Sequence, residues 1–158
     1  MKGLVIYYTL EGNTQFIADT LAKEMDFDVL QLKPIKDVPK KGFSKYVWGG
    51  KQVLFNQKPE LEPFNKDFEQ YDVIIMGSPV WASSYVPAYN TFFSENSIQN
   101  KKIALFCCYA GNEGKIFEAF KSKLSGNEIL GQIGFKDPLK YNTQQNMDVA
   151  KKWIHKCI

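Results

Sequence analysis

The 158-residue sequence contains no arginine, one histidine and three cysteines. Because arginine is absent, no guanidinium group can bind a phosphate in bidentate fashion, and any phosphate must be held by backbone amides, hydroxyls or lysine. Cys107 and Cys108 are adjacent and Cys157 lies near the end of the chain, a spacing that suits neither a disulfide framework nor a metal site. We therefore expect no disulfide and no bound metal, and we place the lone His155 on the surface.

Long apolar runs and clustered charges are also missing. No stretch of eighteen apolar residues occurs, so we expect no membrane-spanning segment. The chain passes from Lys2 directly into an apolar run, without the pattern of a signal peptide, which favours a cytoplasmic protein. Its net charge of +3 comes from lysines scattered along the chain, and this distribution gives no support for nucleic-acid binding.

The apolar residues fall into short runs that predict alternating strands and helices. Continuous apolar runs, typical of strands buried on both faces, occur at 4–8, 72–77 and 102–108, and weaker strands are predicted at 27–32 and 129–135. Helical patterns occur at 17–25, at 42–56 with a break or bend at Gly49-Gly50, from Pro87, at 116–124 and from Asn142 or Thr143, with a short helical turn within 64–70.

This alternation predicts one α/β domain over residues 1–158. Buried strands separated by helices form a parallel sheet covered on both faces, and right-handed crossovers make it a doubly wound sandwich. In such sheets ligands bind outside the carboxyl ends of the strands. The three loops at 9–14, 78–85 and 109–115 all follow strands at that edge, so we expect them to converge on one site.

Loop 9–14 has the composition of an anion site. It joins a buried strand to a helix, so free N–H groups and the positive end of the helix point to one place. Thr9 and Thr14 offer hydroxyl donors, Asn13 offers an amide, and Gly12 allows close approach of the backbone. The alternative interpretation is an ordinary helix start, in which Asn13 and Thr14 are turn residues and no ligand binds.

Several other phosphate sites are excluded by the sequence. The dinucleotide fingerprint G-x-G-x-x-G is absent after the first strand, where only Gly12 occurs. The P-loop pattern is absent because Gly114-Lys115 is followed by Ile116. The middle strand ends in Met76-Gly77-Ser78 and lacks the aspartate of a receiver domain. A cysteine phosphatase of the C-x5-R type would need an arginine.

With these sites excluded, the three loops together resemble those of the flavodoxin family. Residues 9–14 are similar to the family's [ST]-x-T-G-x-T loop, which wraps the phosphate of flavin mononucleotide (FMN), with Glu11 in place of the middle threonine. Residues 77–81 match a G-[ST]-P-V-W segment of flavodoxin-like proteins, and residues 108–115 resemble the family's S-Y-G-x-G-D-G-K segment, which borders the flavin ring. The resemblance covers essentially the whole chain and implies a flavodoxin-like, five-stranded sheet in the order 2-1-3-4-5.

The resemblance implies that FMN is the cofactor and that these loops hold it. Leu10 and Glu11 would contribute mainly backbone N–H groups, with the Glu11 side chain pointing into solvent. Aromatic side chains of the later loops would cover the ring, and residues 110–112 would present N–H groups to its pyrimidine edge. The cofactor-binding residues implied in this way are Thr9, Leu10, Glu11, Gly12, Asn13, Thr14, Ser78, Pro79, Val80, Trp81, Tyr85, Cys108, Tyr109, Ala110, Gly111, Asn112 and Gly114.

The leading functional prediction is an FMN-binding redox protein that transfers electrons between redox partner proteins, as a monomer or a dimer. The alternative is an NAD(P)H-dependent, FMN-containing quinone-type reductase, in which residues 42–58 serve as a lid. The lack of a separate nicotinamide motif and the short chain favour the electron carrier, so no catalytic residue is assigned. A third alternative is a ligand-binding or structural domain that has lost its flavin, against which the intact loop 9–14 argues. Electron-carrier flavodoxins are typically acidic, whereas this chain is net positive.

Overall fold

The computed structural model describes residues 1–37 and 56–158. The helix predicted at 42–56 and the lid predicted at 42–58 lie almost entirely outside the described residues. Within the described part of the chain, strands and helices alternate as the apolar pattern predicts.

Five parallel strands form the sheet, in the order β2-β1-β3-β4-β5. The strands are β1 (Gly3–Tyr7), β2 (Asp28–Gln31), β3 (Val73–Pro79), β4 (Lys102–Tyr109) and β5 (Glu128–Lys136). The three continuous apolar runs form the central strands because only a central strand is covered on both faces and both sides. The two weaker runs form the edges. The predicted doubly wound fold and its strand order are therefore confirmed.

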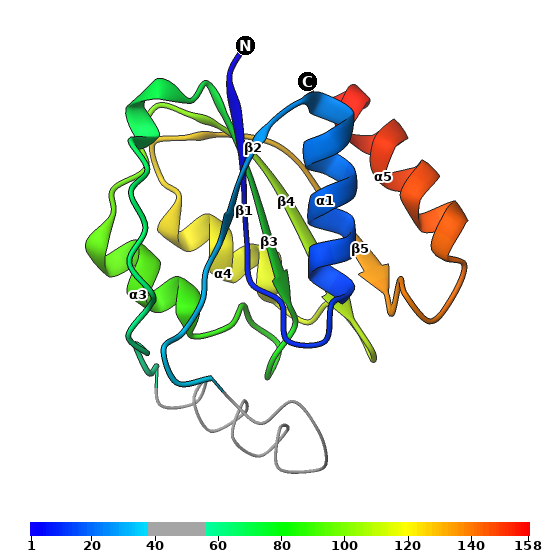
Figure 1. Cartoon of the computed structure of the whole chain (residues 1–158), viewed down its shortest axis with the longest axis horizontal. Coiled ribbons are helices and arrows are strands. Elements are labelled where there is room, and N and C mark those ends of the chain that lie inside the picture. Colours follow the sequence, from blue (N-terminus) through cyan, green and yellow to red (C-terminus); the bar gives the residue numbers. More distant parts are fainter. Residues whose placement is uncertain (38–55) are drawn as a thin grey trace.

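Helices cover both faces of the sheet (Figure 1). One face carries α1 (Asn13–Met25) and α5 (Thr143–Cys157), and the other carries α3 (Ala88–Glu95) and α4 (Ile116–Lys123). The predicted turn within 64–70 is a short 3-10 helix, η1 (Phe68–Gln70). None of the described helices is long and apolar enough to cross a membrane.

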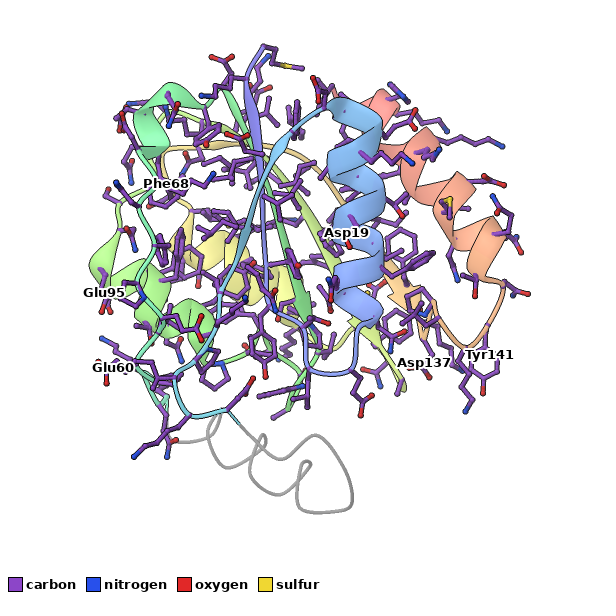
Figure 2. All side chains as sticks on the ribbon, in the orientation of Figure 1. Asp19, Glu60, Phe68, Glu95, Asp137 and Tyr141 are labelled. Carbon is purple, nitrogen blue, oxygen red and sulfur yellow. The ribbon has the colours of Figure 1, made fainter. Side chains whose placement is uncertain are left out.

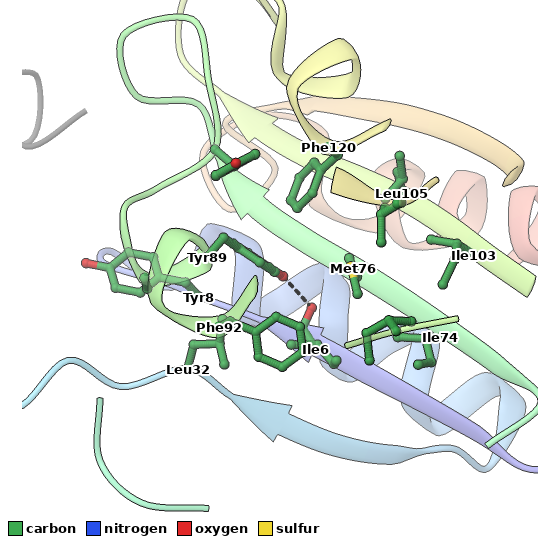
Figure 3. Packing of buried hydrophobic residues seen from close by; sticks show 14 of the residues in the cluster. Ile6, Tyr8, Leu32, Ile74, Met76, Tyr89, Phe92, Ile103, Leu105 and Phe120 are labelled. Carbon is green, nitrogen blue, oxygen red and sulfur yellow. Dashed lines mark hydrogen bonds between the residues drawn. The ribbon is translucent and has the colours of Figure 1, made fainter. Parts of the chain in front are cut away.

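The alternation of side chains along the strands divides the core into two layers. In β1, Leu4 and Ile6 join the cluster beneath α3 and α4, whereas Val5 and Tyr7 join the cluster beneath α1 and α5. Figure 3 shows the first cluster, in which the Tyr89 hydroxyl donates a hydrogen bond of 2.9 Å to the Ile6 carbonyl. Because the strands are held from both faces, the loops at their carboxyl ends start from fixed positions.

Strand β3 extends two residues beyond its predicted end at Gly77. Pro79 pairs with Cys108 of β4, and the Val80 N–H donates to the Cys108 carbonyl at 3.0 Å. Proline is tolerated at the end of a strand, where its missing N–H breaks no further ladder bond. Ser78 and Pro79 therefore belong to the strand and not to the predicted loop 78–85.

Helix α5 begins where predicted but lacks the predicted side-chain cap. Asn142 precedes the helix with a φ of 51° and makes no capping hydrogen bond, because a side-chain cap normally requires an extended backbone at this position. Thr143 is the first residue of the helix. His155 is 56% exposed, as predicted.

Candidate cofactor site

A cavity of about 330 Å³ opens at the carboxyl edge of the sheet. Its volume lies within the range of small-molecule sites, roughly 300–1,000 Å³. Its wall comes from the segments that follow β1, β3, β4 and β5, and the lining residues are Thr9, Leu10, Glu11, Asn13, Thr14, Pro79, Val80, Trp81, Ala82, Cys108, Tyr109, Ala110 and Asp137. The three loops singled out in the sequence therefore do converge on one cavity.

The backbone of the first loop allows a ligand to come close to the start of α1. Gly12 has a φ of +97°, and its N–H donates to the Thr9 hydroxyl oxygen at 3.0 Å. That contact uses the Thr9 oxygen as an acceptor and leaves its O–H free to donate. Helix α1 has no side-chain cap and no acidic residue in its first turn, so its first N–H groups keep their donor capacity. The loop thus presents donors without a competing carboxylate on the helix.

The orientation of the Asn13 amide is set by a segment distant in sequence. Its Oδ1 accepts a hydrogen bond of 3.0 Å from the Leu139 N–H, in the loop between β5 and α5. The amide oxygen is therefore occupied, and Nδ2 remains as a donor beside the cavity that Asn13 lines.

The second loop is a tight turn with an unusual backbone. The N–H of Trp81 donates to the Ser84 carbonyl at 3.0 Å, and the N–H of Ser84 donates to the Trp81 carbonyl at 2.9 Å. Between them, Ala82 and Ser83 both have positive φ, 45° and 67°. This conformation is unfavourable for residues with a Cβ, at about 1–2 kcal/mol each, so neighbouring structure must hold the turn.

The third loop holds the second one in place. The Lys115 N–H donates to both the carbonyl and the hydroxyl oxygen of Ser83, each at 2.9 Å. Gly114, with a φ of +56°, packs so closely that an added Cβ would lie 2.7 Å from the Ser83 Cα. Asn112 closes the same turn by accepting from the Gly114 N–H at 2.9 Å. The two loops predicted to border the flavin ring are therefore interlocked.

Two of the three aromatic candidates reach the cavity. Trp81 and Tyr109 line it, and Trp81 makes an edge-to-face contact with Tyr8 at 5.4 Å between ring centroids. Tyr85 does not line it. Its ring is only 7% exposed and packs in the core, 4.9 Å from the ring of Phe120.

Other predicted contacts also fall outside the lining. Ser78 is fully buried, and its hydroxyl accepts from the Val86 N–H at 3.1 Å. Gly12 shapes the first loop without lining the cavity. The exposed turn that follows Ala110 and supports Ser83 contains Gly111, Asn112 and Gly114. The remaining eleven of the seventeen predicted residues are brought together.

Two further residues line the cavity that no sequence motif predicts individually. Ala82 lies inside the predicted loop 78–85 but has no functional group that would single it out. Asp137 follows β5 directly, and Figure 2 shows it at the end of that strand, with Tyr141 further along the same loop. The rule that ligands bind at the carboxyl edge could have found Asp137, but β5 is diluted by glycine and carries no motif.

The thiol and the phenol that line the cavity are neutral groups near pH 7. Burial raises the pKa of the Cys108 thiol to about 12, although a hydrogen bond from Thr14 opposes the rise. Burial also raises the pKa of the Tyr109 hydroxyl, so both groups stay protonated near neutral pH. The charged lining residues are the carboxylates Glu11 and Asp137, and no lysine is among them. Glu11 is exposed and also lines the cavity; the solvent-facing direction of its side chain stays a prediction.

Comparisons with known proteins agree with this architecture. A family model described as Flavodoxin matches residues 2–157. The flavodoxin-like domain-containing protein BilS of Clostridioides difficile (strain CD3) is 32% identical over 139 residues, which cover 84% of this chain and 64% of BilS. The chain thus spans just under two thirds of that relative's length.

Solved structures share the fold. A flavoprotein from Lactobacillus acidophilus NCFM, in complex with FMN, superimposes with a TM-score of 0.73 at 23% identity, covering 91% of this chain and 98% of its own. Oxidised flavodoxin 2 from Bacillus cereus superimposes with a TM-score of 0.60 at 18% identity, covering 99% of this chain and 97% of its own.

Proposed function

The chain belongs to the flavodoxin family, and we propose that it binds FMN in the cavity at the carboxyl edge of its sheet and passes electrons between protein partners. The observation that carries this proposal is the make-up of the cavity wall. One cavity is lined by the hydroxyl-bearing loop before α1 and by the aromatic side chains Trp81 and Tyr109 of two other loops. A phosphate group and a flat ring system need these two kinds of surface side by side.

The first loop fits a phosphate group without a positively charged side chain. The start of α1 offers backbone N–H groups and the positive end of the helix. Thr9 adds a free O–H, and Asn13 adds the Nδ2 that remains when Leu139 occupies its oxygen. These donors suit a dianion, and they match the absence of arginine from the sequence.

The other loops fit a flavin ring. Trp81 and Tyr109 offer aromatic surface, and stacking adds about 0.5–1.5 kcal/mol to the burial of a flat apolar ring. Bound FMN would supply the redox chemistry, while the protein holds the ring and sets its surroundings. The interlock of Ser83 with Gly114 and Lys115 would keep the wall of the ring site rigid.

The sequence favours an electron carrier over a self-sufficient reductase, because it has no separate nicotinamide motif. Reduction by NADPH, as expected of a quinone-type reductase, is therefore the opposing outcome of the test.

Cofactor binding is tested by titrating the purified apoprotein with FMN and with riboflavin. We expect FMN to bind at one equivalent with quenching of its fluorescence. Riboflavin should bind at least tenfold more weakly, because it lacks the phosphate that the first loop holds. Equal affinity for the two ligands would contradict the phosphate assignment, and no binding of either would overturn the proposal.

The role of the protein is tested by anaerobic mixing with NADPH, with dithionite as a positive control. A carrier should be reduced by dithionite but not by NADPH alone within the time of a stopped-flow experiment. Rapid bleaching of the flavin band by NADPH would instead establish the reductase.

A further inference from the structure

Trp81 offers an indole ring to the cavity, but its backbone does not orient that ring. The two hydrogen bonds with Ser84 fix the turn, yet they leave the side-chain torsions of Trp81 free. The side chain is half-buried, so solvent borders part of it. Its orientation toward a ligand must therefore come from a neighbouring side chain.

Tyr8 is the aromatic neighbour of Trp81 in the buried cluster against which Trp81 packs. The two ring centroids are 5.4 Å apart and the ring planes are inclined by 82°, an edge-to-face arrangement that aromatic pairs prefer. Among the described residues, Tyr8 is the aromatic residue that contacts Trp81. Tyr8 itself does not line the cavity, so it would act through the indole.

Tyr8 is held firmly enough to serve as a fixed support. Its ring is 1% exposed, and its backbone N–H donates to the Gly77 carbonyl of β3 at 3.3 Å. Its hydroxyl donates to Asp37 Oδ1 at 2.7 Å. Figure 3 shows this hydroxyl directed away from the other labelled core residues. Burial and the nearby Asp37 carboxylate raise the pKa of Tyr8, so the hydroxyl remains a donor.

We propose that Tyr8 is a positioning residue for the cofactor ring, acting by holding the Trp81 indole edge-to-face at the cavity wall. The inference rests on the proposed function, because it assigns the orientation of Trp81 to the binding of FMN. The strength of an edge-to-face pair corresponds to an effect of about 2- to 10-fold in the dissociation constant for FMN.

The orientation of Trp81 is tested first in the apoprotein. In a Trp48→Phe, Trp153→Phe background, Trp81 is the remaining tryptophan of the three in the sequence. We expect Tyr8→Leu to increase acrylamide quenching of Trp81 fluorescence and to weaken its near-ultraviolet circular dichroism. The matched control is Tyr71→Leu, because Tyr71 is also 1% exposed and donates to a carboxylate, Asp28, at 2.6 Å, but does not contact Trp81.

The effect on FMN is tested by a double-mutant cycle. Tyr8→Leu should raise the dissociation constant for FMN about 2- to 10-fold in the parent protein and leave it unchanged in a Trp81→Leu background. The same increase in both backgrounds would show that Tyr8 acts on the fold in general, and would overturn the inference. Unchanged quenching of Trp81 in Tyr8→Leu would also overturn it.

Two further outcomes are covered by the same design. If the parent protein binds no FMN, the proposed function fails, whereas the apoprotein fluorescence still decides whether Tyr8 holds Trp81. If Tyr8→Leu does not fold, as judged by far-ultraviolet circular dichroism, Tyr8→Met replaces it, because methionine fills much of the space with a flexible side chain that has no ring. It should also raise the quenching of Trp81, and parental quenching would then count against the inference.

Discussion

At the scale of single residues, Gly12 has the strongest influence on the first loop. Its φ of +97° is a backbone angle that residues with a side chain rarely adopt. An added Cβ would lie 3.4 Å from Leu139, which is an ordinary van der Waals distance. Substitution at this position is therefore costly because of the backbone and not because of crowding.

We expect Gly12→Ala to lower the free energy of unfolding by about 1 kcal/mol and to weaken FMN binding, because relief of the strain turns the loop N–H groups away. Chemical denaturation and FMN titration measure the two effects. The control is Gly126→Ala, which also carries a positive φ, +85°, but contacts the flexible end of Gln99. It should lose stability and keep parental FMN affinity. Equal FMN affinity in both variants would contradict the phosphate assignment.

The aromatic candidates show a limit of prediction from single residues, because only some of them line the cavity. Trp81 and Tyr85 both lie in an aromatic-bearing loop, and the sequence gives no reason to separate them. The tight turn between Trp81 and Ser84 returns the chain toward the core, so that Tyr85 packs against Phe120. That turn has Ala82 and Ser83 at positions where glycine or asparagine is the usual signal. No local sequence pattern therefore predicts the turn between Trp81 and Ser84.

At the scale of elements, the interlock between the second and third loops has a direct test. Gly114→Ala would place a Cβ 2.7 Å from the Ser83 Cα, and a backbone atom cannot give way as a side chain can. We expect a loss of about 2 kcal/mol or more in the free energy of unfolding, with weaker FMN binding. Denaturant titration gives the first quantity. Gly111→Ala, in the same loop, meets nothing within 4 Å and should match the parent. If Gly114→Ala has the free energy of unfolding of the parent, the contact between the two loops does not contribute to stability.

Helices α1 and α5 are joined by a cluster of charges around Glu24. Its carboxylate contacts His155 Nε2 at 2.9 Å and Lys151 Nζ at 3.1 Å. Hydrogen bonds from His155 and then Lys151 hold the pKa of Glu24 below its ordinary value of 4.5. A carboxyl group with a lowered pKa stabilises the fold above that ordinary value, and the contribution is lost as the pH falls through the lower pKa of the folded state.

We therefore expect Glu24→Gln to be less stable than the parent at pH 7. The difference should shrink below about pH 4.5, as the parent carboxyl becomes protonated. Thermal unfolding across pH 3–7 measures it. Glu95→Gln, at the exposed end of α3, is the control for removing a carboxylate outside this cluster. A difference between Glu24→Gln and parent that grows toward low pH would contradict the assignment.

The elements themselves were largely predictable, and the reason is physical. Central strands must be apolar at every position, so the sequence marks 4–8, 72–77 and 102–108 clearly. The extension of β3 to Pro79 was missed because it depends on pairing with Cys108, which is distant in sequence. Asp137 was missed for a related reason, since the weakly patterned edge strand β5 places it.

At the scale of the whole molecule, the net charge of +3 bears on the reduction potential of bound FMN. Positive charges favour the anionic reduced flavin and raise its potential, whereas the carboxylates Glu11 and Asp137 that line the cavity act in the opposite direction. Lys136→Glu with Lys140→Glu, flanking Asp137, should lower the potential by on the order of ten millivolts per unit charge at low salt. Potentiometric titration measures the shift.

The control for this charge effect is Lys152→Glu with Lys156→Glu. Both residues are exposed on α5, toward the end of the chain that lies opposite the loop before α1 in Figure 1. It should lower the potential less, and both shifts should fade at high salt. Equal shifts from the near and distant pairs would show that local charge does not govern the potential.

The wall of the cavity is assembled from chain segments that run from Thr9 to Asp137. On the ribosome, the first loop is made before its partners around Cys108 and Asp137. Pairing of distant strands is the slow part of folding. A nascent chain without these partners therefore has no complete cavity, and FMN is expected to load onto the finished fold. The supply of flavin in a cell would then set the fraction of folded protein that holds FMN, and would not affect how the chain folds during synthesis.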